Sequence, residues 1–209
     1  MKRKLIVYFA GIDGSGKTTV AESLCDSLRS DGLSCKYLWG GWRGFESPLF
    51  KPIASRTKKI LAERGEAEKV QEAHSKLPLF GYLTWLDYFI RVYPYLFASL
   101  ITNDIVVLDR YVYDVLAGLV GPDRGVSRVL FALFKVFPQP SIVFFIRIPP
   151  EVAYARKDDI PSIDFLRHVE QTILGILAAC SVKVVTLDGT RSKNELREST
   201  LTITRSLMT

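Results

Sequence analysis

The chain has 209 residues, 48% of them hydrophobic and 24% charged, which is typical of a globular protein that folds as one domain, here residues 1–209. Its formal net charge of +6 suits a polyanionic ligand, yet the basic residues are dispersed, which favours a solvated basic surface over a nucleic-acid site. The three cysteines follow no disulfide or metal-binding spacing, so they predict buried thiols, a reducing compartment and a cytoplasmic protein.

Apolar runs alternate along the chain with longer helical patterns, which predicts β-α units around a parallel sheet. Five short runs are expected to form buried strands: residues 5–10, 36–38, 105–108, 141–146 and 182–187. The first helix is predicted over residues 17–29, where Val20, Leu24 and Leu28 repeat at four-residue spacing. The expected fold is therefore a three-layer α/β fold with a central five-stranded parallel sheet.

The middle of the chain is expected to hold a loop and two helices. Residues 40–44 form a glycine-rich loop, and the basic stretch 56–59 is expected to begin a helix. Residues 79–101 are apolar enough to raise the question of a membrane span. Asp87, Arg91 and Pro94 make a spanning helix costly, so we expect a buried or dimer-forming helix and no membrane span.

Two helices nearer the C-terminus carry their own start signals. Ser162 is the expected N-cap of a helix striped by Phe165, Val169 and Ile173. Ser192 and, three residues later, Glu195 form a capping-box pattern before the last helix. Because such side chains hydrogen-bond the free N–H groups of a first turn, they predict where both helices begin.

The strongest motif lies between the first strand and the first helix, where residues 11–18 match G-x-x-x-x-G-K-[ST] completely. The glycines let backbone N–H groups turn inward around phosphates, Lys17 supplies a point charge, and the Thr18 hydroxyl is a Mg²⁺ ligand. The helix that follows adds its N-terminal partial positive charge. We therefore expect a P-loop NTPase fold that binds ATP and Mg²⁺ through these residues: Gly11, Ile12, Asp13, Gly14, Ser15, Gly16, Lys17, Thr18 and Thr19.

A second motif, Asp109-Arg110-Tyr111, ends the third apolar run. An open α/β sheet binds its ligand at the carboxyl ends of the strands, so Asp109 is expected to join Thr18 in the Mg²⁺ shell. Arg110 beside it would neutralise phosphate charge in the transition state. The sequence lacks the N-K-x-D motif of a GTPase and the Asp-Glu strand end of many motor ATPases, which favours a kinase.

With both motifs in hand, the chain resembles the thymidylate kinase family. Four segments occur in family order: the phosphate loop 9–19, the Asp-Arg-Tyr motif 107–111, the lid entry 148–152 and the base-side loop 187–191. The resemblance implies a nucleoside-monophosphate kinase fold with ATP as donor and a nucleotide phosphate as acceptor. It also implies a homodimer packed through helices.

The resemblance also assigns roles to single residues. It implies that Asp13 touches the sugar hydroxyl of the acceptor and that Arg110 bridges the donor and acceptor phosphates, with Tyr111 beside it. It puts Arg191 among the residues that bind the donor. The expected catalytic residues are Lys17, Arg110, Asp13 and Arg156.

The acceptor pocket departs from the family pattern. Arg43 lies in the loop where the family carries Arg-Glu-Pro-Gly, so it is the candidate to hold the acceptor phosphate. The arginine that reads thymine is replaced by Tyr88, and a glutamine is replaced by Leu119. Trp85 and Tyr88 are therefore expected either to stack against another flat acceptor, together with Phe89, or to belong to the core of an aromatic helix.

The lid is short as well, because the next helix is expected almost directly after residues 155–161. Arg156 and Lys157 are its only cations, and a short lid shields the transferring group less from water. Three functions stay open. The best expectation is transfer from ATP to a nucleoside monophosphate, with dTMP as the single best acceptor. The alternatives are a P-loop kinase with a nucleoside or non-nucleotide acceptor, and a non-catalytic nucleotide-binding module.

Overall fold

The computed structural model describes residues 4–63, 79–120, 127–157 and 160–208. Five parallel strands form one sheet in the order β2-β3-β1-β4-β5. The strands are β1 (Leu5–Ala10), β2 (Cys35–Trp39), β3 (Ile105–Asp109), β4 (Ile142–Arg147) and β5 (Val184–Asp188). The predicted α/β fold with its five-stranded parallel sheet is confirmed, and each strand begins and ends within two residues of the prediction.

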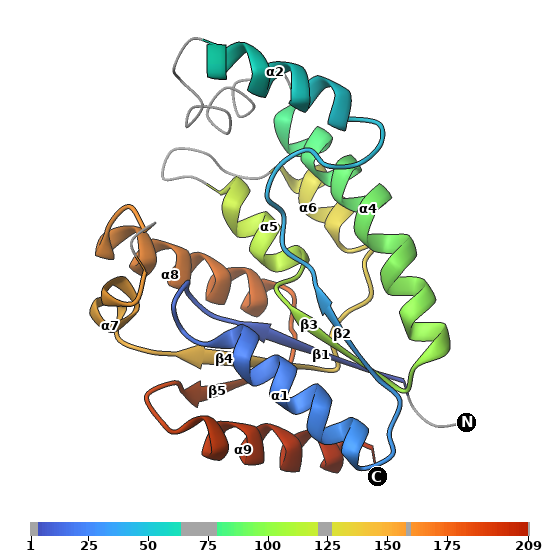
Figure 1. The fold of residues 1–209 in the computed structure, drawn as a ribbon, viewed down its shortest axis with the longest axis vertical. Coiled ribbons are helices and arrows are strands. Elements are labelled where there is room, and N and C mark those ends of the chain that lie inside the picture. The colour runs from blue at the N-terminus through green and yellow to red at the C-terminus, as the bar shows by residue number, and fades with distance from the viewer. Residues whose placement is uncertain (1–3, 64–78, 121–126, 158–159, 209) are drawn as a thin grey trace.

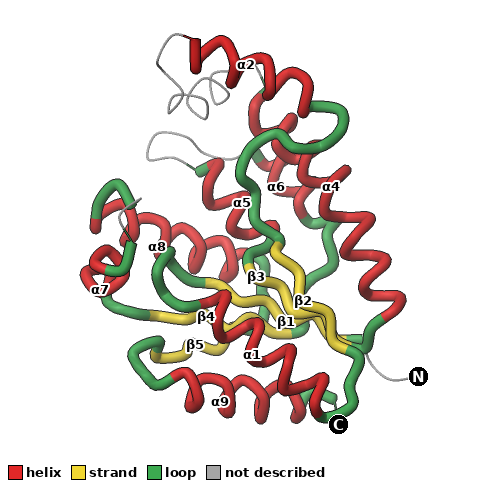
Figure 2. The backbone as a smooth tube through the Cα atoms, in the orientation of Figure 1, coloured by secondary structure: helices red, strands yellow, loops and turns green. Residues whose placement is uncertain are grey.

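The helices pack against both faces of this sheet (Figure 1). They are α1 (Lys17–Ser30), α2 (Lys51–Glu63), α4 (Phe80–Thr102), α5 (Val112–Leu119), α6 (Arg128–Phe134), α7 (Pro150–Ala155), α8 (Ile163–Ala179) and α9 (Lys193–Ser206). Helices α1 and α9 cover one face, while α4, α5 and α8 cover the other, as the tube drawing also shows (Figure 2). The described part of the chain thus has the expected three layers.

Strand β1 shows why both faces must be covered. All six of its side chains are buried, with Leu5, Val7 and Phe9 in the core under α1 and α9. The alternate residues, Tyr8 among them, belong to the core under α4, α5 and α8. Because burying one large apolar side chain contributes about 1.5–3 kcal/mol, this two-sided strand anchors both cores. Its carboxyl end therefore holds the phosphate loop in a fixed place.

Helices α8 and α9 begin directly after the N-cap residues that the sequence predicted, Ser162 and Ser192. The Ser162 hydroxyl accepts a hydrogen bond from the Phe165 N–H at 3.1 Å, and Ser192 and Glu195 form the reciprocal capping box. The helix expected to begin within 56–59 instead begins at Lys51, and none of its residues is buried. The basic stretch 56–59 therefore lies inside the helix and does not begin it.

Helix α4 holds the loop that follows β2. The buried Asp87 carboxylate accepts hydrogen bonds from the Trp42 indole N–H (3.1 Å) and from the backbone N–H groups of Glu46 (3.2 Å) and Ser47 (2.8 Å). One turn further along α4, Arg91 donates to the Glu46 carboxylate at 2.6 Å. These bonds fix the loop against α4, so its side chains are presented to the region above the sheet.

Gly40 begins this loop at a point of close approach. Its N–H donates to the Asp109 carbonyl at 2.9 Å, and its carbonyl accepts from the Tyr88 hydroxyl at 2.8 Å. A Cβ at this position would lie 2.5 Å from the Arg110 carbonyl oxygen, which no side chain could tolerate. Glycine is therefore required where the loop crosses the Asp-Arg-Tyr motif.

Two further expectations concern α4 and the cysteines. None of the helices in the described ranges is long and apolar enough to span a membrane. The apolar helix α4 instead packs on the sheet, with Tyr88 and Leu96 in the core. The three cysteines are buried free thiols, as the sequence predicted.

Candidate active site

The phosphate loop joins the end of β1 to the start of α1. The Lys17 side chain is 5% exposed, and its ammonium donates to the carbonyl oxygens of Gly11 (2.8 Å) and Ile12 (2.6 Å). Gly14 has a φ of 82°, and a Cβ there would lie 2.7 Å from the Ala153 carbonyl oxygen. The loop therefore closes around a lysine that points back over its own backbone.

Two observations on this loop fit a polyphosphate ligand. Among the described residues, the buried Ser15 hydroxyl has no hydrogen-bond partner, so a polar group is left over inside the loop. Burial, reinforced by the nearby Arg110 charge, lowers the pKa of Lys17 to about 8. Phosphate oxygens would supply a partner for the hydroxyl and would stabilise the charged lysine.

The two predicted Mg²⁺ ligands lie in direct contact. The Thr18 hydroxyl donates to Asp109 Oδ2 at 2.6 Å, and the Tyr37 hydroxyl of β2 donates to the same oxygen at 3.0 Å. No group of three or more His, Cys, Asp or Glu side chains in the described residues could hold a metal by itself. A hydroxyl and one carboxylate suit Mg²⁺, which keeps several waters and takes further oxygens from the substrate phosphates.

Arg110 connects the phosphate loop to the neighbouring helix α5. Its guanidinium pairs with the Asp13 carboxylate on the loop, and it lies 3.9 Å from Asp114 Oδ1 on α5. Burial alone would raise the pKa of Asp13, but Arg110, Lys17 and Lys157 together hold that pKa below its usual value. Asp13 is therefore a carboxylate surrounded by cations at the mouth of the phosphate loop.

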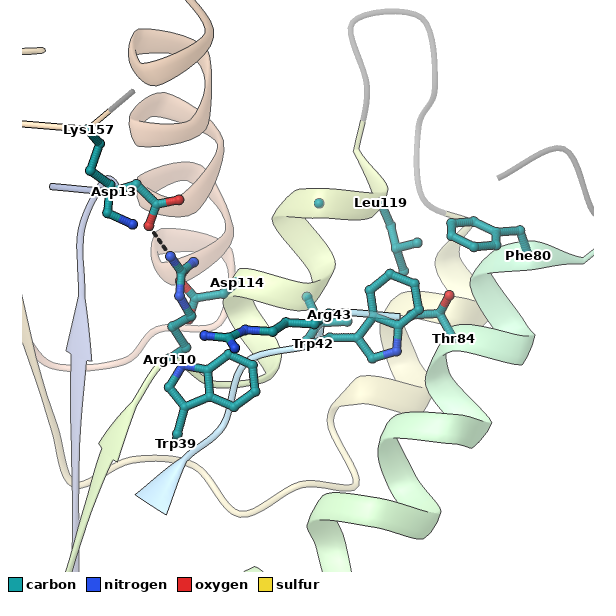
Figure 3. Close-up of a pocket in the computed structure, with 12 residues that line it drawn as sticks. Asp13, Trp39, Trp42, Arg43, Phe80, Thr84, Arg110, Asp114, Leu119 and Lys157 are labelled. Carbon is teal, nitrogen blue, oxygen red and sulfur yellow. Dashed lines mark hydrogen bonds and ion pairs between the residues drawn. The ribbon is translucent and has the colours of Figure 1, made fainter. Parts of the chain in front are cut away.

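A cavity of about 630 Å³ opens beside Arg110. Its lining residues are Asp13, Trp39, Trp42, Arg43, Phe80, Thr84, Arg110, Asp114, Val115, Gly118, Leu119 and Lys157. Figure 3 shows that the lining has two unlike ends: Asp13, Arg110 and Lys157 gather at one end, and Trp42 and Phe80 at the other. The volume lies within the range of small-molecule sites, and the lining fits a ligand with a charged end and a flat apolar end.

The aromatic end of the cavity is built by the loop after β2 and the start of α4. The rings of Trp42 and Phe80 meet edge to face with centroids 5.9 Å apart, and Arg43 lies over the Trp39 ring at 4.6 Å. Thr84 is fully buried, and its hydroxyl has no partner among the described residues. This hydroxyl gives the apolar end one free hydrogen-bonding group.

Three residues predicted to bind the acceptor have other surroundings. Tyr88 and Tyr111 are fully buried, and their hydroxyls donate to the carbonyls of Gly40 and Pro138, both at 2.8 Å. Trp85 stacks on Phe89 with ring centroids 5.1 Å apart. None of the three is among the lining residues of the cavity. Tyr88 lies in the core under α4, α5 and α8, and Trp85 and Phe89 pack against that core.

Other predicted residues do reach the cavity or the loop. Arg43, placed by its loop, lines the cavity, as does Leu119. From the lid entry, Arg156 donates to the Gly14 carbonyl at 3.1 Å, and Lys157 lines the cavity. Of the predicted lid 155–161, residues 158 and 159 lie outside the described residues. The two cations predicted for the lid, Arg156 and Lys157, therefore lie beside the phosphate loop and the cavity.

The predicted donor-binding residue Arg191 follows β5. Its exposed side chain is 4.0 Å from the Asp188 carboxylate, in the loop between β5 and α9. A second cavity of about 520 Å³ lies beside this loop and is lined by residues that include Ile148, Pro149 and Thr190. Arg191 therefore borders a cavity at the carboxyl edge of the sheet but is not one of its lining residues.

Asp114 is a site residue that the sequence reasoning missed. It lies one helical turn after Arg110, in the third position of α5, where an acidic side chain completes a capping box with Tyr111. The available signal was an acidic residue in the first turn of the helix after the Asp-Arg-Tyr motif, where a carboxylate can accept from free backbone N–H groups. Burial raises the pKa of Asp114, although Arg110 opposes the shift.

Comparison with known proteins agrees with this geometry. A family model described as thymidylate kinase matches residues 9–200. The chain is 25% identical over 210 residues to a thymidylate kinase of Leptospira interrogans, covering 97% of this chain and 94% of the relative. It is 27% identical to a probable thymidylate kinase of Metallosphaera sedula (97% and 93% covered) and 29% identical to a thymidylate kinase of Chlorobium phaeobacteroides (76% and 68%).

The lowered pKa of Lys17 predicts that binding of a nucleoside triphosphate takes up protons. Phosphate oxygens favour the charged ammonium and raise a pKa that is about 8 in the free protein. Uptake should therefore reach roughly half a proton at pH 8 and vanish near pH 6.5, where the free lysine is already charged. Calorimetric titration with ATP·Mg²⁺ in buffers of different ionisation enthalpy measures this. A binding enthalpy at pH 8 that does not depend on the buffer, or equal uptake in Lys17→Met, would contradict the assignment.

Proposed function

Since the chain belongs to the thymidylate kinase family, we propose that it transfers the γ-phosphoryl group of ATP to a nucleoside monophosphate, with dTMP as the acceptor. The observation that carries this proposal is the position of Arg110. Its guanidinium contacts the phosphate loop through Asp13 and lines the cavity in which an acceptor would lie. A cation shared by both sites is what transfer between two phosphates requires.

The donor phosphates would lie on the loop of residues 11–18 with Lys17 and the N-terminus of α1. Thr18 and Asp109 would hold Mg²⁺, which neutralises charge on the transferring group when bound. Arg156, already in contact with the Gly14 carbonyl, would reach the phosphates from the opposite side. In this arrangement the chain acts as one kinase domain whose short lid, 155–161, contributes cations more than cover.

The acceptor would lie along the cavity from its charged end to its aromatic end. Its phosphate would face Arg110, with Arg43 and Lys157 as further cations, and Asp13 would accept a hydrogen bond from its sugar hydroxyl. The base would lie against Trp42 and Phe80. Tyr88 would act indirectly, because its hydroxyl holds the Gly40 carbonyl, next to the lining residue Trp39. The Tyr111 hydroxyl holds the Pro138 carbonyl, and its backbone N–H donates to Asp114, which lines the cavity.

The Thr84 hydroxyl is the group best placed to read the edge of the base. It is buried at the aromatic end without a partner in the described residues, close to Trp42 and Phe80 in Figure 3. A buried polar group left unpaired costs about 1–3 kcal/mol, and a base with a donor or acceptor facing it would recover that energy. This hydroxyl would replace the arginine that is absent at Tyr88.

A panel of acceptors tests the proposed function. ADP release from ATP·Mg²⁺ should depend on dTMP and should exceed the release seen with other nucleoside monophosphates and with nucleosides. Lys17→Ala, purified in the same way, is the matched control, since any turnover left in it reveals a contaminating kinase. ADP release that is indifferent to every member of the panel would overturn the nucleotide-kinase function. A response to nucleosides alone would reassign the acceptor.

We further propose that the chain forms a homodimer through α4. Three large side chains on this helix are more than half exposed: Tyr95 (56%), Phe97 (54%) and Ile101 (63%). Exposed apolar groups gathered on one helix favour a protein interface. Sedimentation velocity should show a dimer that Phe97→Glu converts to a monomer, while Phe165→Glu on α8 leaves it intact. A wild-type monomer at micromolar concentration would contradict this proposal.

A further inference from the structure

Asp114 is a buried carboxylate with two differently placed oxygens. Its Oδ2 accepts hydrogen bonds from the Tyr8 hydroxyl of β1 and from the Tyr111 backbone N–H, both at 2.7 Å. Its buried Oδ1 has no hydrogen-bond partner among the described residues and lies 3.9 Å from the Arg110 guanidinium, and the residue is one of those that line the acceptor cavity. One oxygen is thus fixed to the core, and the other faces a cation at the site.

Helix capping alone does not explain a carboxylate here. Helix α9 also has a carboxylate in the third position of its capping box, but Glu195 is exposed, whereas the Asp114 side chain is only 7% exposed. A buried carboxylate costs several kcal/mol unless a cation compensates it. The charged groups that face Asp114 are Arg110 and, more remotely, Lys17, so its charge is balanced chiefly by Arg110.

Arg110 in turn needs support from its neighbours. It is one of three non-glycine residues in the described chain with a left-handed backbone (φ 65°), a conformation that costs about 1 kcal/mol or more. The pKa of Arg110 is raised because Asp114 and Asp13 outweigh the effect of burial. When an acceptor phosphate takes the place of Asp13 at the guanidinium, Asp114 is the carboxylate that stays in position.

We propose that Asp114, held by Tyr8 and the Tyr111 amide, is a positioning residue that keeps the Arg110 guanidinium between the phosphate loop and the acceptor cavity. The inference rests on the proposed function, in which Arg110 serves the transferring phosphoryl group. Tyr8 transmits the rigidity of the central strand to this carboxylate, since its ring is fully buried in the core. The arginine is thereby preorganised by β1 and α5 together.

A double-mutant cycle tests the proposal through turnover. Asp114→Asn keeps the shape but removes the charge, and it should lower kcat about tenfold while the KM for ATP stays within twofold. Tyr8→Phe should act in the same direction with a smaller effect. In an Arg110→Ala background, Asp114→Asn should change kcat by less than about twofold. Asp164→Asn, an exposed aspartate with an 89% exposed side chain, is the matched control and should leave kcat unchanged.

Equal losses from Asp114→Asn in both backgrounds, or no loss in the wild type, would overturn the positioning role. A second readout does not depend on the acceptor. We compare the change in unfolding midpoint that Asp114→Asn causes, without ligand, in the Arg110→Ala background and in the wild type. The change in the Arg110→Ala background should be more positive by at least about 2 °C. Additive midpoints would also overturn the proposal. Absence of dTMP turnover in the wild type would count against the proposed function instead, and the midpoints would still decide the role of Asp114.

Discussion

The parallel pairing of β1 with β3 determines where the chemistry of this protein can take place. In this register Phe9 lies opposite Asp109, so both strands end at the same edge of the sheet. The phosphate loop leaves β1 at that edge, and Arg110 leaves β3 beside it. Because parallel strands need long crossover connections, α1 and α4 are available to cover the two faces while this edge stays open to a ligand.

The charges at this edge are balanced against one another. Lys17 is a buried cation and Arg110 a half-buried one, and their partners come from two elements: the carbonyls and Asp13 of the phosphate loop, and Asp114 of α5. In the proposed function, phosphate oxygens take the place of the loop carbonyls at Lys17 and of Asp13 at Arg110, while Asp114 stays in position. The positive charges are thus in place before an anion binds. Two observations agree with this: the Ser15 hydroxyl has no partner among the described residues, and burial lowers the pKa of Lys17. The aromatic end of the cavity is where we propose that the base of the acceptor lies.

The residues that could be predicted from the sequence are those that follow one another within one short segment of the chain. A phosphate loop is readable because its glycines, Lys17 and Thr18 follow one another along the chain. The five strands were readable because two-sided burial leaves continuous apolar runs. The place of Arg110 followed from a strand end, since parallel strands share their carboxyl edge.

The acceptor pocket could not be predicted in the same way, because its contacts join distant segments. Asp87 looked like an unfavourable charge in an apolar helix, and only the fold shows that it binds the loop of Trp42, 45 residues earlier. Tyr88 was expected either to stack against an acceptor or to belong to the core, and the sequence could not show that its hydroxyl donates to the Gly40 carbonyl. The partner of Asp114, Tyr8, lies 106 residues away on β1. No pattern of spacing along one segment contains such pairs.

The most direct measurement is phosphoryl transfer by Arg110→Ala beside its affinity for ATP·Mg²⁺. Arg110 is proposed to act on the transferring group and not to hold the donor, so kcat should fall by about 10²–10³ while the dissociation constant of ATP changes only a few-fold. Turnover within threefold of the wild type, or a parallel loss of ATP binding, would contradict the role of Arg110 as the cation shared by the two sites.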